Sequence, residues 1–246
     1  MKIKTNDFDF LKTFKSGLFY FFYDDEPKRT VILKNRKINL CFRQKKSFLH
    51  ITTDKEINVS EKNFLIKRVR YCFGIGENMN EFYGICRKDA VLKTLLPKIK
   101  RTRIISAFSD FEALVGAVVS QNNSYGNYRK QMNLLYGNLN FKRSKYLGDL
   151  RKFKVGYKSG YLNELARNYG KVAIDKIKGL GNYSLSLFEI FQKRNYGAFY
   201  VDCLLVKIMR ENYGVESDFD GASKKLWGKY RGLAEAFLQR FFEKKI

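Results

Sequence analysis

Residues 176–206 read KIKGLGNYSLSLFEIFQKRNYGAFYVDCLLV, in which a Gly-Leu-Gly turn stands upstream of a single aspartate. Gly179 and Gly181 can adopt backbone angles that are closed to other residues. A short helix that ends near Lys178 can therefore reverse direction and enter a second helix from about Tyr183. The stretch predicts a helix-hairpin-helix.

Such a hairpin directs backbone N–H groups outward, beside the positive end of the second helix. Amides in this arrangement bind phosphate oxygens, and glycines allow a close approach. We expect a phosphate-binding site at Lys178, Gly179, Leu180 and Gly181. An ordinary turn between two helices is the alternative, because a Gly-x-Gly pair alone is weak evidence.

The charge balance favours phosphate as the partner. The chain has 48 Lys and Arg against 24 Asp and Glu, a net charge of +24, which is typical of nucleic-acid-binding proteins. A generally basic protein or a ribosome-associated protein is the alternative, but such proteins usually concentrate charge in low-complexity tails. Here the charge is spread through a sequence with 45% hydrophobic residues, enough to bury a sizeable core.

Membrane and metal chemistry have little support in the sequence. No apolar run approaches the roughly 20 residues of a membrane span, and the N-terminus lacks a secretory signal, so we expect an intracellular protein. The cysteines form no Cys-x-x-Cys pair, and we interpret them as buried thiols: Cys41, Cys72, Cys86 and Cys203. The single histidine, His50, lies in a strand-like segment, which makes histidine-dependent catalysis improbable.

The hydrophobic pattern changes once along the chain. From about Gly17 to Thr53, short β-branched or aromatic runs (18–23, 30–33, 38–42 and 48–52) alternate with polar links such as 24–27, a pattern typical of an antiparallel sheet. After about Ser60 the spacing becomes helical, with Ser109–Asp110 as one helix start. We therefore predict an α+β fold: an N-terminal antiparallel β-sheet subdomain (1–58) packed on a mainly helical domain (59–246) that contains the helix-hairpin-helix at about 171–193.

Four groups of segments carry a family resemblance: FEALVGAVVSQNN at 111–123, GYKSGY at 156–161, the hairpin 177–181 with YVD at 200–202, and WGKYRGLA at 227–234. They resemble the helix-hairpin-helix (HhH-GPD) superfamily of DNA glycosylases, in particular the 8-oxoguanine enzymes and the AlkA-type 3-methyladenine enzymes. The last of these segments looks like the family's closing helix. The resemblance spans roughly residues 10–240 and implies a DNA repair enzyme that acts on double-stranded DNA containing a damaged base.

Asp202 is the candidate catalytic residue. Breaking the bond between a base and its deoxyribose creates positive charge on the sugar, which a fixed carboxylate stabilises while it orients or deprotonates water. Apolar neighbours on both sides of Asp202 favour partial burial and a raised pKa. A helix N-cap for a helix that begins near Cys203 is the structural alternative, and the two roles are compatible.

Tyr183 stands where bifunctional relatives carry the lysine that forms a Schiff base with the sugar. A phenol cannot form that intermediate, so we predict a monofunctional glycosylase without AP-lyase activity. We expect Tyr183 either to line the lesion pocket or to pack in the core. Lys178 and Lys158 are candidate substitutes for the lysine, although such lysines more often bind phosphate.

The resemblance also implies residues that enter the DNA when the base is extruded. Asn122 is the first candidate for the wedge, with its neighbours Gln121 and Asn123, and Tyr157 resembles a second wedge on the opposite strand. The alternatives are a polar helix end for the first three residues and a packed loop aromatic for Tyr157.

The sequence gives competing indications of the substrate. The missing lysine and an aromatic-rich chain favour alkylated purines such as 3-methyladenine, while the outer motifs favour 8-oxoguanine, and deaminated bases remain an alternative. No iron–sulfur cluster is implied, because clustered cysteines are absent. The resemblance allows a monovalent cation on hairpin carbonyls, and we expect a monomer that needs no other cofactor. A DNA-binding module without catalysis and an RNA-binding or structural basic protein are the alternatives from other classes.

Overall fold

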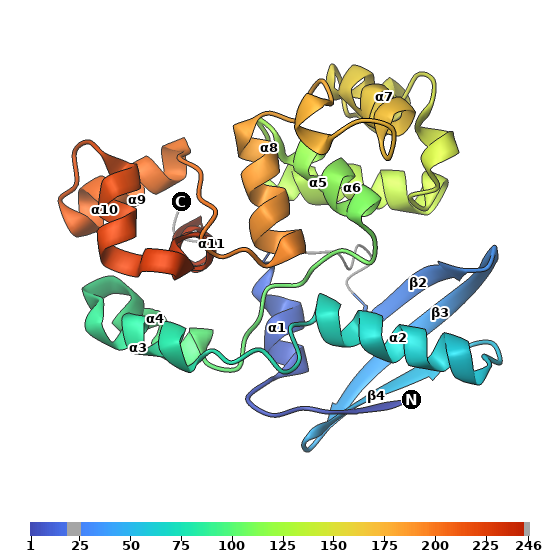
Figure 1. Ribbon diagram of the computed structural model, residues 1–246, viewed down its shortest axis with the longest axis horizontal. Helices are drawn as coiled ribbons and strands as arrows, with labels where there is room; N and C mark the ends of the chain where they lie inside the picture. Colours follow the sequence, from blue (N-terminus) through green and yellow to red (C-terminus); the bar gives the residue numbers. More distant parts are fainter. Residues whose placement is uncertain (19–25, 244–246) are drawn as a thin grey trace. The chain divides into compact units, whose positions relative to one another are not determined.

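The computed structural model describes residues 1–18 and 26–243 (Figure 1). The chain forms two compact units: the sheet unit, Met1–Phe108 with Val201–Ile246, and the hairpin unit, Ser109–Tyr200. The predicted boundary after residue 58 marks the change from strands to helices, whereas these units group elements by packing. The sheet unit therefore includes helices from both ends of the chain.

A four-stranded antiparallel sheet forms the N-terminal part of the sheet unit, as predicted. Its strands are β1 (Lys2–Lys4), β2 (Lys28–Leu33), β3 (Arg36–Lys45) and β4 (Phe48–Thr53), in the order β1-β4-β3-β2. The predicted runs at 30–33, 38–42 and 48–52 all lie in strands. The predicted run at 18–23 and the turn at 24–27 fall largely on residues 19–25, outside the described part of the chain. β1 was not anticipated, because three residues are too few to show a period.

Alternating side chains give the sheet one apolar face. Ile38, Leu40 and Phe42 of β3 are at most 2% exposed, while the residues between them face outward. The apolar face packs on α1 (Phe10–Ser16) and α2 (Val59–Cys72), and α2 runs along the sheet in Figure 1. Rings from three elements meet there, with the Phe42 and Phe73 centroids 5.2 Å apart.

Local sequence explains where these helices begin. Asn58 and Glu61 form a reciprocal capping box at the start of α2, and Glu61 also accepts from Arg36 of β3 at 2.7 Å. This ion pair joins the sheet to α2. Asp9 caps α1 through Lys12, and Gly17, with φ at +70°, ends that helix.

The rest of the sheet unit is helical. Its helices are α3 (Asn80–Lys88), α4 (Ala90–Ile99), α9 (Cys203–Tyr213), α10 (Phe219–Trp227) and α11 (Arg231–Glu243). Asp89 caps α4 and also accepts from Trp227 Nε1 at 2.8 Å and from the Tyr213 hydroxyl at 3.0 Å. The predicted closing helix at 227–234 is instead the end of α10, a 3₁₀ turn (Gly228–Tyr230) and the start of α11. Gly228, with φ at +52°, follows α10 directly.

The hairpin unit is organised around α5. Its helices are α5 (Asp110–Ser120), α6 (Tyr125–Leu139), α7 (Lys158–Asn168) and α8 (Asn182–Leu187), which continues as a π-helix (Phe188–Lys193). Shorter 3₁₀ turns cover Arg143–Tyr146, Arg151–Phe153 and Ile174–Lys176. Ser109 caps α5 as predicted, and every residue from Phe111 to Val119 is buried against α6, α7 and α8.

The remaining predictions can be checked directly. Cys72 and Cys86 are buried thiols as expected, but Cys203 is exposed and Cys41 half-buried, so the prediction is wrong for these two residues. His50 lies in β4, as predicted. Among the helices of residues 1–18 and 26–243, none has the length and apolar character that crossing a membrane requires.

Candidate functional site

Asp202 occupies the N-cap of α9 in the sheet unit. Its Oδ1 accepts from the Leu205 amide at 2.8 Å and from Gln239 Nε2 at 3.0 Å. Burial raises the pKa of Asp202 above its usual value, and the hydrogen bonds from Leu205, Gln239 and Leu204 oppose that rise. The N-cap alternative is therefore correct, and the carboxylate is also partly desolvated, as a stabiliser of positive charge requires.

Gln239 on α11 was missed by the sequence reasoning. Its Nε2 donates to Asp202 and also reaches Glu235 Oε1, at 3.3 Å, one helical turn earlier. Glu235 is completely buried. Because Gln239 is 37 positions from Asp202 along the chain, no local pattern links the two residues.

The hairpin of the hairpin unit needs only one of its two glycines. Gly179 has φ at +96°, and a Cβ there would lie 2.5 Å from the Tyr161 ring. Gly181 has an ordinary φ of −83°, and a Cβ on it would meet no atom within 4 Å. Gly181, which is the N-cap of α8, therefore does not use the backbone freedom that glycine offers.

The amides of the hairpin are not equivalent. The Leu180 amide donates to the Ile177 carbonyl at 3.1 Å, and the Leu180 side chain is buried, which speaks against the predicted phosphate contact at Leu180. Within the described part of the chain, the Gly179 and Gly181 amides donate to no acceptor. The Lys178 side chain is exposed. These three residues thus retain the geometry that a phosphate contact needs.

Gln121 braces the hairpin from the end of α5. Its Nε2 donates to the Gly179 carbonyl and to Ser184 Oγ, both at 2.7 Å. A side chain held in this way is not available to enter DNA, which speaks against Gln121 as the wedge. The bonds also mean that the Gly179 carbonyl already has a donor.

Asn122 and Tyr157 lie together on the surface of the hairpin unit. Asn122 is exposed, in the left-handed region at φ +44°, and its Nδ2 is 3.3 Å from the Tyr157 hydroxyl. The Tyr157 side chain is 59% exposed. Asn123, by contrast, is held by Val119 and by Gln131 Oε1, the latter at 2.8 Å. Of the three neighbouring candidates, Asn122 is the one that projects.

Two further candidates, Tyr183 and Lys158, lie in different environments. Tyr183, in the first turn of α8, packs edge-to-face on Tyr200 with ring centroids 5.0 Å apart. Lys158 is only 4% exposed, and its Nζ donates to the Val119 carbonyl at 2.7 Å. Burial lowers the pKa of Lys158. The buried amine speaks against the predicted phosphate contact at Lys158.

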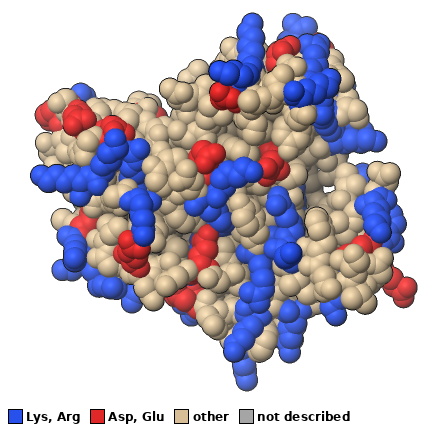
Figure 2. Space-filling view, viewed as in Figure 1, with Lys and Arg blue, Asp and Glu red and all other residues tan. Residues whose placement is uncertain are grey.

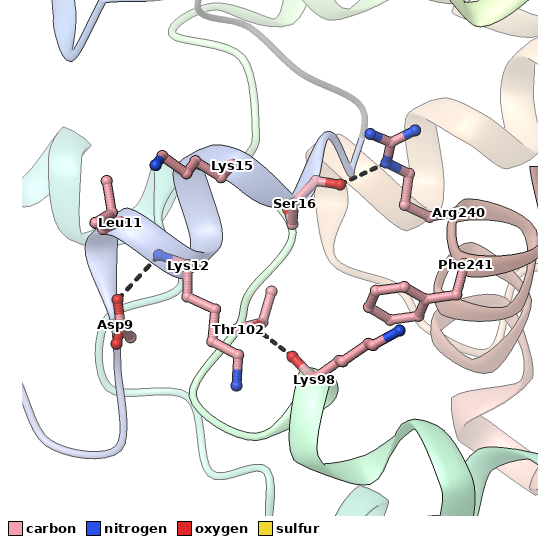
Figure 3. Close-up of a pocket in the computed structure, with 9 residues that line it drawn as sticks. All are labelled: Asp9, Leu11, Lys12, Lys15, Ser16, Lys98, Thr102, Arg240 and Phe241. Carbon is pink, nitrogen blue, oxygen red and sulfur yellow. Dashed lines mark hydrogen bonds between the residues drawn. The ribbon is translucent and has the colours of Figure 1, made fainter. Parts of the chain in front are cut away.

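A hollow of about 460 Å³ in the sheet unit contains none of the predicted site residues (Figure 3). Two of its basic side chains, Lys12 and Arg240, already hold neighbouring elements. Lys12 Nζ donates to the carbonyls of Pro97 and Lys100 at 2.6 and 2.7 Å, and Arg240 Nε donates to the Ser16 carbonyl. We therefore interpret Lys12 and Arg240 as structural. Among the described residues, no group of three or more His, Cys, Asp or Glu side chains could hold a metal ion.

Comparison with known proteins identifies the fold. No protein-family model and no curated protein sequence matches the chain. Among solved structures, the 3-methyladenine DNA glycosylase from Archaeoglobus fulgidus matches with a TM-score of 0.80 at 14% identity, covering 98% of this chain and 99% of that one. The 8-oxoguanine glycosylase/lyase of Clostridium acetobutylicum, in complex with double-stranded DNA containing cytosine opposite 8-oxoguanine, matches with a TM-score of 0.72 at 18% identity, covering 100% and 99%. The chain therefore has the α+β fold of these DNA glycosylases.

Proposed function

We propose that the protein is a DNA glycosylase that extrudes a damaged base from double-stranded DNA and hydrolyses its N-glycosidic bond. The observation that carries the proposal is the partly buried Asp202 carboxylate, which has a raised pKa and is oriented by Leu205 and Gln239. The shared fold and the +24 net charge support the same function.

The chemistry follows from the position of the negative charge. As the base departs, the sugar gains positive charge, which ionised Asp202 stabilises through space. The carboxylate then accepts a proton from water as the oxygen of that water bonds to the anomeric carbon. The hydrogen bonds from Leu205 and Gln239 to Oδ1 keep the carboxylate oriented. The same bonds favour the ionised form of Asp202, because a carboxylate is the stronger acceptor.

The hairpin unit supplies the expected DNA contacts. Exposed Asn122 and Tyr157 form an adjacent pair suited to filling the space left by an extruded base. Lys178 and the amides of Gly179 and Gly181 suit a phosphate oxygen. The family resemblance also suggests a monovalent cation bound by hairpin carbonyls. No step of the proposed reaction depends on this cation.

Alkylated purines are the substrate class that we favour. A cationic base such as 3-methyladenine leaves as a neutral molecule, so stacking on aromatic rings can replace acid catalysis. Tyr183 and Tyr200, which pack edge-to-face and are half-buried, offer aromatic surface for such stacking. Tyr183 also provides no amine for Schiff-base formation, which supports a monofunctional enzyme. Removal of 8-oxoguanine is the second candidate, because the similar Clostridium acetobutylicum enzyme is an 8-oxoguanine glycosylase/lyase.

The decisive experiment is base release from duplexes that contain 3-methyladenine, 7-methylguanine, hypoxanthine, uracil or 8-oxoguanine, each read with and without alkali. We expect strand breaks only after alkali, strongest with an alkylated purine, and no covalent complex after borohydride. Asp202→Asn should lower the rate on the order of 10²-fold or more, because it removes the charge while asparagine still caps α9.

Asp218→Asn is the matched control, since Asp218 is an exposed N-cap of α10 in the same unit. It should leave base release unchanged. Equal loss in both variants, or no release from any duplex, contradicts the proposal and favours a DNA-binding module. Breaks without alkali, together with borohydride trapping, contradict the monofunctional assignment alone.

A further inference from the structure

The outward face of the sheet carries an ordered set of cations and rings. Antiparallel register places Lys2 opposite His50 and His50 opposite Arg43, so these three side chains form one row across β1, β4 and β3. Two residues further along, Lys4, Phe48 and Lys45 form a second row. We name these six residues the basic sheet patch.

The geometry of the patch is regular. The rings of Phe48 and His50 lie two positions apart on the same face of β4. Each ring has a cation beside it on both neighbouring strands. Strands lie about 4.8 Å apart, and alternate residues of one strand lie about 6.7 Å apart. The four cations therefore form a rectangle around the two rings.

The positive charge of the patch has no acidic counterpart nearby. In the described part of the chain, no carboxylate lies within 4.0 Å of the charged groups of Lys2, Lys4, Arg43 or Lys45. Acidic residues at the other end of the face are engaged elsewhere: Glu26 with Lys28, and Asp54 with Asn39.

His50 lies within this positive charge. Burial is the main cause that lowers the pKa of His50, and the positive charges of Lys2, Lys45, the Met1 amine and Arg43 lower it further. Lys2 Nζ lies 4.7 Å from the centroid of the Phe48 ring. A ligand that brings negative charge and a flat ring would satisfy both the cations and the rings.

We propose that the basic sheet patch binds single-stranded DNA, with its backbone along β4 and bases against Phe48 and His50. Proteins that bind single strands combine a basic surface with aromatic side chains on which bases stack, and four-stranded sheets provide such platforms. A duplex offers phosphates but no free base faces, so it would leave the two rings unused. A stacked base replaces Lys2 over Phe48, and Lys2 then meets a phosphate.

This site goes beyond the proposed function. It lies in the sheet unit, whereas the hairpin and the candidate wedge lie in the hairpin unit. The proposed chemistry assigns no role to the patch, so the two proposals can fail independently.

The first test uses the wild-type chain, in which His50 is the only histidine. Its ring resonance is recorded by NMR without DNA and with saturating dodecathymidylate. We expect the resonance to shift in the complex, because a stacked base and its phosphates change the surroundings of the ring. An unshifted resonance at saturation, or no binding of the oligonucleotide, overturns the proposal.

The second test compares variants by the anisotropy of the labelled oligonucleotide. The double variant Arg43→Gln/Lys45→Gln should lower the slope of log affinity against log salt by about 1.4, or 0.7 for each lost phosphate contact. Phe48→Leu should weaken binding roughly tenfold. The matched control Lys62→Gln/Lys67→Gln removes the same charge from exposed positions of α2 and should leave the slope unchanged.

Equal effects in the two double variants indicate a diffuse charge effect and overturn the site. Tighter binding of a duplex than of the single strand by the wild type, lost with Arg43→Gln/Lys45→Gln but unaffected by Phe48→Leu, overturns the choice of single-stranded DNA. Base release is measured on the same preparations. Its loss with Asp202→Asn and persistence in the patch variants would separate the outcome for this site from the outcome for the proposed function.

Discussion

At the scale of single residues, Asp202 shows two opposing effects on one carboxylate. Burial raises its pKa, while donors from α9 and from Gln239 lower it again. The net effect is a raised pKa, so the carboxylate loses its charge at a higher pH than an exposed aspartate. Activity that depends on ionised Asp202 should therefore fall on acidification with a midpoint above the ordinary value of 3.8.

Gln239→Leu tests this balance. The variant removes a donor that favours the ionised carboxylate, so the pKa of Asp202 should rise further and the acid limb of the base-release profile should move to higher pH. The measurement is single-turnover base release against pH. A lower rate with an unmoved acid limb would mean that Gln239 acts on substrate or packing rather than on Asp202.

At the scale of elements, the hairpin depends on packing as well as on glycine. Gly179 adopts a left-handed conformation directly against Tyr161 of α7, and Gln121 of α5 binds its carbonyl. Gly181 begins α8 in an open position with an ordinary φ. The same residue type thus has a steric requirement at one position and none two residues later.

Alanine substitution should separate the two glycines. Gly179→Ala should lower the free energy of unfolding by about 1–3 kcal/mol, through backbone strain and contact with the Tyr161 ring. Gly181→Ala should change stability by less than about 1 kcal/mol, because the restriction of the unfolded chain and the poorer N-cap that alanine provides oppose each other. Urea unfolding measures both values, and equal losses would show that the hairpin geometry described above is wrong.

At the scale of the whole molecule, charge dominates the surface chemistry. Figure 2 shows Lys and Arg side chains spread over elements of both units, with scattered Asp and Glu. Many of the ion pairs are exposed, such as Arg151–Asp149 and Lys229–Glu81, and exposed pairs contribute little to stability. The excess of positive charge is therefore better explained by an anionic partner than by stability.

Affinity for undamaged duplex should accordingly depend steeply on salt. We expect a loss on the order of 10³-fold between about 50 and 200 mM salt, as for proteins that contact six or more phosphates. Asp202→Asn should follow the same dependence, because Asp202 contributes to the reaction and not to phosphate contact. Filter binding over a salt series measures it, and a flat response would contradict a phosphate-dominated interface.

Local patterns in the sequence were enough to predict the strands at 30–33, 38–42 and 48–52, the cap of α5 at Ser109 and the cap of α9 at Asp202. These features depend on neighbours within a few positions, so alternation and capping chemistry reveal them. The Gly-Leu-Gly turn predicted the hairpin, and the family resemblance added the order of the candidate site residues. Asp202 itself was found because its type, its apolar flanks and its place after the hairpin are all visible in the sequence.

The tertiary structure was needed for the roles of residues whose partners lie far along the chain. Lys158 and Gln121 look like polar site residues, but Val119 is 39 positions from Lys158, and Gly179 is 58 positions from Gln121. Gln239 joins Asp202 in the same way, and the basic sheet patch exists only because β1, β4 and β3 pair in one register. Hydrogen bonding and burial depend on which segments meet in space, and spacing within one segment carries no information about that.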